Sequence, residues 1–141
     1  MPFWKIHHPK DAYSFDDKQQ LARNLTDIYA AFMPRFYVNV LFEEVDAASF
    51  FIGGESHGRF VRITIDHIAR TMNDETTIRF IDRVNAVIAP WVLDRGYDWE
   101  LHIDETPMNM WSVQGYYPPH QGTVDWDRWT AENKPSPRTH G

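Results

Sequence analysis

The sequence predicts an α+β fold made of two successive βαβ units, which share a four-stranded, mainly parallel sheet with two helices on one face. Two amphipathic helical stripes alternate with four segments rich in β-branched and aromatic residues, and this order occurs twice. A length of 141 residues suits a single domain. We expect the two halves at residues 1–56 and 57–115, and a C-terminal arm at residues 116–141 that packs on the domain or on a neighbouring subunit.

The first half begins with a strand and a helix. Residues 3–8 mix aromatic, β-branched and polar residues, which favours a strand. Ser14 followed by Asp17 resembles a capping box, so a helix is predicted over residues 15–32. Pro34 ends this helix, because the residue before a proline avoids the α region. The apolar stripe of the helix consists of Leu21, Leu25, Ile28 and Phe32.

A second strand and a hairpin complete the first half. Residues 37–44 are rich in β-formers and predict a strand. Residues 49–52 are a short strand or hairpin arm, which stops at the turn signal Gly53-Gly54. The second half opens at residues 60–69, where apolar and polar side chains alternate as in a third strand.

A second helix follows, with Asp74 as its candidate cap and Pro90 as its end. Its apolar stripe consists of Ile81, Val84, Ile88 and Trp91. Residues 97–103 form the fourth strand, and residues 107–111 a helical turn. The remaining chain is rich in proline and glycine, which indicates an arm without a core of its own.

The predicted sheet has one face without a cover. Two helices can cover only one face of four strands, whereas parallel sheets are normally buried on both sides. Association with other copies of the chain is the simplest solution, and the many aromatic residues suit an interface.

The composition excludes several classes of protein. Fourteen basic against twenty acidic residues give a net charge of −6 and no basic block, so nucleic acid is not an expected partner. No apolar run approaches the ~18 residues of a membrane span, and the first residues lack the pattern of a signal peptide. Zero cysteines exclude disulfides, thiolate metal sites and thiol catalysis. We therefore expect a soluble, cytoplasmic protein without a membrane partner.

The second residue is a candidate catalytic group. An initiator methionine before a small residue is normally removed, which would leave Pro2 as a terminal secondary amine. Burial or a neighbouring cation would lower the pKa of this amine and turn it into a base near pH 7. Most proteins that begin Met-Pro make no such use of the proline, so its position alone decides nothing.

Four segments of the chain, besides Pro2 and Arg70, match a known pattern: Leu25–Asp27, Val40–Glu43, Phe51–Gly54 and Trp99–Pro107. Together they resemble the tautomerase superfamily and, within it, the group of cis-3-chloroacrylic acid dehalogenase. The chain is also similar to uncharacterised fungal members that share HHP, YVNVLF, GGE, DHIAR and GYDWE. The resemblance implies a homotrimer, an amino-terminal proline at the bottom of a pocket, a small carboxylic acid substrate, and no metal or organic cofactor.

The resemblance assigns two roles that the sequence keeps. The terminal proline falls on Pro2, as an acid/base catalyst. The first arginine that binds the substrate carboxylate falls on Arg70, and a planar guanidinium suits this role because it grips both carboxylate oxygens.

Other family positions are altered. The second arginine falls on Asn73, which is uncharged, and the histidine of the first helix falls on Tyr29, which can still donate a hydrogen bond. The tyrosine of the later strand falls on His102. The glutamate that activates water in the dehalogenase falls near Val113 or Gln114, neither of which is a base. Tyr29 and His102 remain candidate catalytic helpers, and Asn73 and Gln114 candidate substrate-binding positions.

Other side chains have simpler interpretations. His67 shares a strand face with Ile63 and Ile65, so we expect a hydrogen-bonded core histidine, and no histidine spacing typical of a metal site occurs. Trp111 is expected at a pocket wall or, somewhat better, at a subunit seam.

The sequence thus leaves two hypotheses from different classes. The first is a cofactor-free enzyme that uses Pro2 and Arg70 on a small 2-oxo, 3-oxo or unsaturated acid. Keto–enol tautomerisation is favoured, a hydratase or decarboxylase is possible, and dehalogenation is disfavoured because the water-activating carboxylate is missing. The second is a catalytically degenerate trimeric binding protein on the same scaffold.

Overall fold

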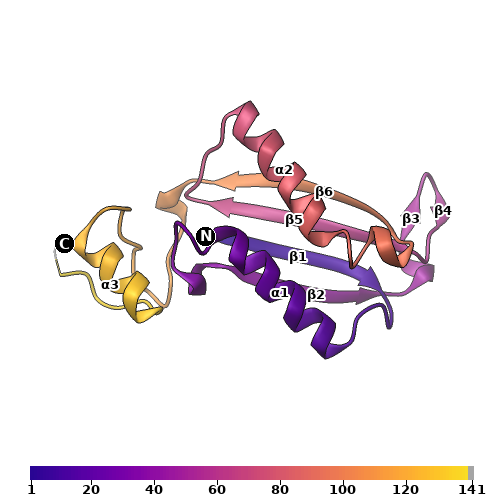
Figure 1. Ribbon diagram of the computed structural model, residues 1–141, viewed down its shortest axis with the longest axis horizontal. Coiled ribbons are helices and arrows are strands. Elements are labelled where there is room, and N and C mark those ends of the chain that lie inside the picture. Colours follow the sequence, from indigo (N-terminus) through magenta and orange to yellow (C-terminus); the bar gives the residue numbers. More distant parts are fainter. Residues whose placement is uncertain (140–141) are drawn as a thin grey trace.

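The protein is a four-stranded sheet with helices on one face and an arm at one end, as the computed structural model of residues 1–139 shows (Figure 1). The sheet order is β2-β1-β5-β6. The outer pairs β1/β2 and β5/β6 are parallel, and the central pair β1/β5 is antiparallel. The strands span Pro2–Pro9 (β1), Asn39–Val45 (β2), Phe60–Ile68 (β5) and Asp98–Thr106 (β6). The predicted mainly parallel sheet of two βαβ units is confirmed.

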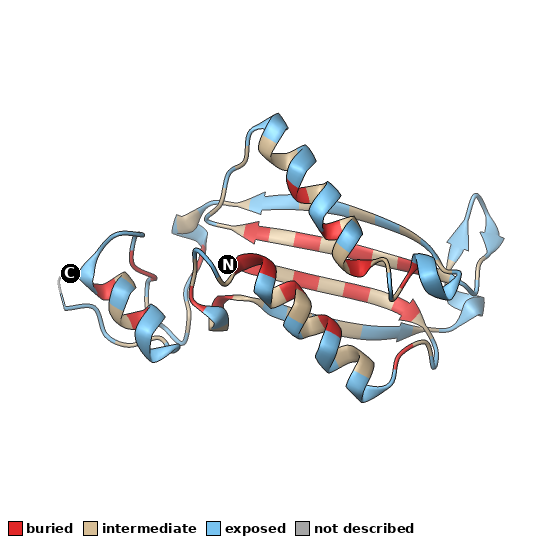
Figure 2. Cartoon of the chain, viewed as in Figure 1, coloured by how far each residue is buried: buried red, intermediate tan, exposed pale blue. Residues whose placement is uncertain are grey.

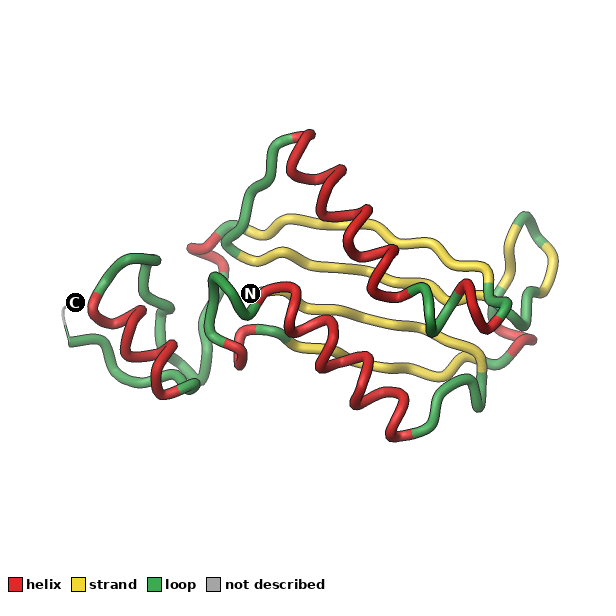
Figure 3. The backbone as a smooth tube through the Cα atoms, viewed as in Figure 1, coloured by secondary structure: helices red, strands yellow, loops and turns green. Residues whose placement is uncertain are grey.

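Two long helices lie across the same face of this sheet (Figures 1 and 3). They are α1, Phe15–Tyr29, and α2, Asp74–Ile88. The capping box of α1 is present, since Ser14 and Asp17 exchange side-chain and backbone hydrogen bonds. Among residues 1–139, neither of these helices nor any shorter one has the length and apolar character that crossing a bilayer requires.

The core lies between the sheet and these helices. Side chains along β1 and β5 alternate between buried and half-buried, which appears as regular banding in Figure 2. Aliphatic and aromatic side chains of both helices meet the inward residues of the strands. The central residues are Trp4, Ile6, Leu21, Leu25, Ile28, Tyr29, Val61, Ile63, Ile65, Phe80, Val84 and Ile88.

The opposite face of the sheet carries charged side chains and no covering element within the described residues. Lys5 pairs with Asp66 across β1 and β5 at 3.6 Å, and His7 pairs with Glu43 at 3.0 Å. Leu41 is exposed on the same face. A sheet face that holds both apolar and paired charged groups is suited to contact another protein surface.

Several predicted boundaries differ from the observed ones. Helix α1 ends at Tyr29 rather than at residue 32, because the chain there forms a tighter turn, in which the N–H of Phe32 donates to the carbonyl of Tyr29. Tyr37 belongs to a 3₁₀ turn, Arg35–Tyr37, so β2 starts at Asn39. The hairpin near residue 52 is present, with β3 at Phe51–Ile52 and β4 at Glu55–Ser56.

Helix α2 also differs in detail from the prediction. Its cap is Asn73, whose side-chain oxygen accepts from the backbone N–H of Thr76 at 2.9 Å, so Asp74 is the first helical residue. Phe80 rather than Ile81 is buried, together with Val84 and Ile88. A stripe through Phe80 and a stripe through Ile81 both have the helical period of 3.6 residues. The stripe through Phe80 packs against the sheet, because its aromatic ring fills more space than the side chain of Ile81.

The C-terminal arm contains a helix that the sequence analysis did not predict, α3, Val124–Glu132. Thr123 caps it by accepting from the N–H of Trp126. Trp129 is fully buried and forms a second hydrophobic cluster with Tyr37 and Trp111. The arm therefore packs against the end of the sheet through this shared cluster.

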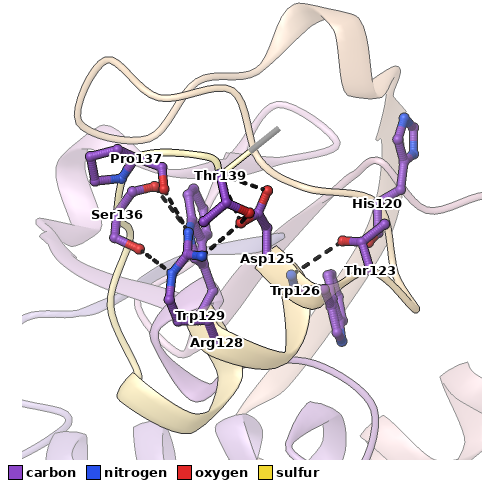
Figure 4. Close-up of polar contacts among 9 residues, drawn as sticks. All are labelled: His120, Thr123, Asp125, Trp126, Arg128, Trp129, Ser136, Pro137 and Thr139. Carbon is purple, nitrogen blue, oxygen red and sulfur yellow. Dashed lines mark hydrogen bonds and ion pairs between the residues drawn. The ribbon is translucent and has the colours of Figure 1, made fainter. Parts of the chain in front are cut away.

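Asp125 ties the end of the chain to α3 (Figure 4). Its carboxylate accepts hydrogen bonds from the N–H and the hydroxyl of Thr139. It also forms an ion pair with Arg128, whose Nη1 donates to Oδ1 at 2.7 Å. Arg128 in turn donates to the hydroxyl of Ser136 and the carbonyl of Pro137. These bonds lower the pKa of Asp125 from 3.8 to about 2, with Thr139 as the largest cause.

We predict that Asp125→Asn loosens the arm, because the substitution removes the negative charge that Arg128 and Thr139 bind. Hydrogen exchange of the α3 amides should speed up in the variant near pH 7. Because the folded pKa is depressed, the contribution of the carboxylate is present above pH 3.8 and is lost as the pH falls towards 2. The difference between wild type and variant should therefore shrink over that window, whereas a constant difference would contradict this assignment. Asp82→Asn, on the exposed side of α2, serves as the control.

Candidate active site

A cavity of about 410 Å³ lies where the chain begins and where β5 ends. The antiparallel pairing of β1 with β5 brings these two points together, since Pro2 lies opposite His67. The turn after α1 and the arm form the other walls. The lining residues are Met1, Phe32, Met33, Tyr37, Ile68, Ala69, Arg70, Met108, Trp111, Pro119, His120, Gln121 and Trp126.

The amino terminus is held inside this cavity by the backbone of β5. The α-amine of Met1 donates to the carbonyl of Ile68, and the N–H of Ile68 donates to the carbonyl of Met1 at 2.8 Å. Pro2 is buried behind it. Burial, and then the charge of Arg70, lower the pKa of the α-amine from 8.0 to about 5. An amine at this place is therefore neutral at pH 7 and can accept a proton.

Arg70 brings a positive charge to the same cavity. Its guanidinium lies 4.7 Å from the ring centre of Phe32 and 5.8 Å from that of Phe80. Its Nη1 is buried, and no hydrogen-bond acceptor within residues 1–139 contacts it. A buried guanidinium nitrogen without an acceptor is costly, so this group is suited to bind an anion such as a carboxylate.

The backbone before Arg70 directs this side chain. Ala69 has a φ of 62°, a left-handed conformation that alanine rarely adopts. Its N–H donates to the carbonyl of Thr106 at 2.7 Å, which fixes the turn against the end of β6. The strain at Ala69 ends β5 and places Arg70 beside the start of β1.

A buried hydrogen-bond chain lies behind the cavity. The indole of Trp4 donates to the hydroxyl of Tyr29 at 3.2 Å, and this hydroxyl lies 2.8 Å from Nε2 of His67. The direction of this second bond follows the tautomer of His67: Nε2 donates to the hydroxyl when it carries the proton and accepts from it otherwise. Burial, followed by Arg70 and the amino terminus, lowers the pKa of His67 from 6.5 to about 4, so the ring is neutral. The predicted hydrogen-bonded core histidine is confirmed.

The structure brings only some of the predicted site residues together. Arg70 lines the cavity, whereas Pro2 is buried behind Met1 and is not part of the lining. Tyr29 lies in the layer behind the cavity. His102 is on the uncovered face of the sheet, where Nδ1 lies 2.6 Å from the guanidinium of Arg62. It does not line the cavity of its own chain.

The two remaining predicted positions lie outside the cavity lining. Asn73 uses its side-chain oxygen to cap α2 and is exposed. Gln114 is exposed in a tight turn, with a φ of 50°, between Val113 and Tyr116. Neither side chain contacts the space next to Arg70 in this chain.

Other lining residues were missed by the sequence analysis. Tyr37 was placed in a strand, and the arm was not expected to supply Trp126 and His120. Trp111 lines the cavity, which was the second choice of the sequence analysis for that residue. The sequence after residue 110 is dense in aromatic residues. This density predicts that the segment packs against other residues, but it does not predict which residues those are.

Comparison with known proteins supports this picture. Residues 1–134 match the family described as "putative oxalocrotonate tautomerase enzyme". No protein of curated function matches the chain significantly.

Solved structures share the fold over nearly the whole chain. Native RhCC from Rhodococcus jostii RHA1 has 42% identity and a TM-score of 0.93, over 96% of this chain and 99% of that one. A probable enzyme from the thermophilic fungus Aspergillus fumigatus has 39% identity and a TM-score of 0.91, over 98% of both chains.

More distant structures match at the level of fold alone. N1, a member of the cis-3-chloroacrylic acid dehalogenase family, has 19% identity and a TM-score of 0.72, over 91% of this chain and 90% of that one. A fused 4-OT, an asymmetric trimer, has 20% identity and a TM-score of 0.65, over 82% of this chain and 94% of that one. Given the match over residues 1–134 and this shared fold, the chain belongs to the putative oxalocrotonate tautomerase family, and with it to the tautomerase superfamily.

Proposed function

We propose that this protein is a cofactor-free enzyme that interconverts the keto and enol forms of a small carboxylic acid, with Pro2 as acid and base. The substrate would be a 2-oxo, 3-oxo or unsaturated acid whose carboxylate pairs with Arg70. One observation carries the proposal. A buried amine and a guanidinium with an unsatisfied nitrogen lie at the same cavity.

Removal of Met1 is the first requirement of this proposal. An initiator methionine that precedes proline is a normal target for removal, and the secondary amine of Pro2 then becomes the chain terminus. The side chain of Met1 packs against the aromatic cluster of Tyr37, Trp111 and Trp129, so its loss vacates space for a ligand. The burial and the positive charge that lower the pKa of the Met1 amine would act on the Pro2 nitrogen in the same way.

The proposed chemistry is a proton transfer between carbon and oxygen. The neutral amine of Pro2 takes the proton from the carbon next to the carbonyl, and the charge that develops is an enolate. The same proton is returned to the enolate oxygen, which restores the neutral amine. The positive charge of Arg70 favours the enolate over the neutral ketone.

The remaining predicted residues have weaker roles in this proposal. Tyr29 contacts His67 rather than the cavity, so we assign it a positioning role beneath Arg70. His102 could serve only a neighbouring subunit, because it lies on the uncovered face. Asn73 and Gln114 would reach substrate only if a partner or a ligand changed their surroundings.

The cavity favours tautomerisation over addition of water. Within the described residues, its lining contains neither aspartate nor glutamate that could activate a water molecule. Hydrolytic dehalogenation is therefore disfavoured, and a hydratase or decarboxylase remains the second option for the same amine.

We also propose a homotrimer. The helix-free face of the sheet carries Leu41 and the ion pairs of Lys5 and His7, and a partner chain would cover it. The fused 4-OT with the same fold is a trimer, which supports this assembly for our chain. A trimer would also allow His102 to approach a neighbouring subunit.

We predict that Pro2→Ala and Arg70→Ala each lower kcat/KM for the enol of phenylpyruvate. Loss of one charge-stabilising group costs about 100- to 1,000-fold in rate, and Arg70→Ala should lie in that range. Alanine is small, so Met1 should be removed in both variants as in the wild type. Arg79→Ala, an exposed arginine on α2 that pairs with Glu75, should keep full activity. Unchanged turnover in both Pro2→Ala and Arg70→Ala would refute the proposal.

The rival hypothesis is a trimeric binding protein that has lost the reactive set. Its support is that three altered positions, Asn73, Tyr29 and the region of Gln114, lack the charge or basicity of their family counterparts. Intact-mass spectrometry of the purified protein separates the two. The enzyme requires loss of Met1, whereas a retained Met1 would block the Pro2 nitrogen and favour the binding protein.

A further inference from the structure

Tyr37 stands out among the residues around the cavity. It lies in the 3₁₀ turn Arg35–Tyr37 and is only 2% exposed. Its ring packs edge-on against Trp111, with ring centres 5.0 Å apart, and against Trp126, with ring centres 5.7 Å apart. Both tryptophans also line the cavity. The position of the Tyr37 ring is therefore fixed by its neighbours, and its hydroxyl cannot easily turn away.

The hydroxyl of Tyr37 has no hydrogen-bond partner in the part of the chain that the structure describes, although it is buried. Two other buried tyrosines differ in this respect. Tyr13 donates to the carbonyl of Trp91 at 2.8 Å, and Tyr29 bonds to His67. Burying a hydroxyl without a hydrogen-bond partner costs free energy of folding. A native protein that retains such a group commonly gives it a functional role.

A second unsatisfied donor lies at the same cavity. Nη1 of Arg70 is also buried without an acceptor. The side chain of Met1 packs against the cluster that contains Tyr37, so removal of Met1 would uncover this wall. Burial raises the pKa of Tyr37, so the phenol is neutral near pH 7 and can donate its proton to an acceptor.

We propose that the hydroxyl of Tyr37 is a substrate-binding donor, which holds the keto or enol oxygen of a 2-oxo acid while Arg70 holds the carboxylate. This inference rests on the proposed function, whose substrate carries both of these oxygen groups. A ligand of this class satisfies two donors that no residue of the described chain satisfies.

The volume and the lining of the cavity also indicate the size and the chemistry of the remaining part of the substrate. A volume of about 410 Å³ exceeds the needs of a three-carbon acid, and it lies within the range of sites for larger ligands. The large aromatic side chains of Trp111 and Trp126 line this space. The substrate is therefore a 2-oxo acid with a flat apolar substituent, such as an aryl group.

Two ligands that differ in one oxygen test this assignment. Phenylpyruvate has the carboxylate, the oxo group and the ring, whereas 3-phenylpropionate lacks only the oxo group. Their dissociation constants are measured by calorimetry for the wild type, Tyr37→Phe and the control Tyr13→Phe. The free energy of unfolding of each variant is measured in urea at one protein concentration.

We expect Tyr37→Phe to weaken phenylpyruvate about 3- to 10-fold, the effect of one hydrogen bond, and to leave 3-phenylpropionate unchanged. Its stability should stay the same or rise, because the substitution removes an unsatisfied hydroxyl. Tyr13→Phe should show the opposite pattern, with lower stability and unchanged affinities, because its hydroxyl bonds to Trp91 far from the cavity.

Three results would overturn the inference. The first two are an equal change in the dissociation constants of both ligands in Tyr37→Phe, and no change in either. The third is a loss of stability like that of Tyr13→Phe. Each would show that the hydroxyl of Tyr37 has a structural role only. A wild type that binds neither acid would exclude the ligand class. The proposed function fails separately, if the wild type binds phenylpyruvate through Tyr37 but does not tautomerise its enol.

Discussion

The site depends on a half-buried guanidinium whose buried Nη1 has no acceptor within the described residues. Arg70 lies between the rings of Phe32 and Phe80, which attract its charge without neutralising it. Burial, and after it this charge, lowers the pKa of the amino terminus and of His67. A carboxylate of the protein in this position would occupy the guanidinium and leave no donor for the anion of a ligand. Within the described residues the buried nitrogen of Arg70 has no acceptor, and burial is the larger cause of the lowered pKa of the amine, with Arg70 second.

The fold places these groups together through its topology. Antiparallel pairing of β1 with β5 puts the start of the chain opposite the end of β5, although about 65 residues separate them in a chain of two βαβ units. The left-handed Ala69 then stops β5 and turns Arg70 towards the cavity. The arm adds aromatic walls and is fixed by Asp125, so its helix serves the site as well as the core.

The sequence predicted features that depend on local patterns. The capping box at Ser14, the alternation along β5 and the buried His67 follow from the spacing of a few neighbouring residues. The order of helices and strands and the resemblance to the tautomerase superfamily follow from longer segments, and the structure and the family match confirm both.

Features that depend on tertiary packing were not predicted. Helix α3 is only nine residues long and is flanked by prolines, so its periodic signal is weak. The choice of Phe80 over Ile81 requires knowledge of the sheet that they face. The role of Tyr37 rests on the absence of a partner for its hydroxyl, and no sequence pattern records an absence of contact.

The pKa of the Pro2 amine tests the account most directly. It can be measured by NMR titration of protein labelled with ¹⁵N-proline, in the wild type and in Arg70→Ala. We predict a wild-type pKa well below the ordinary value of about 8 for an α-amine, and a rise in Arg70→Ala because a positive neighbour is removed. A wild-type pKa at or above the ordinary value, unchanged in Arg70→Ala, would contradict the account.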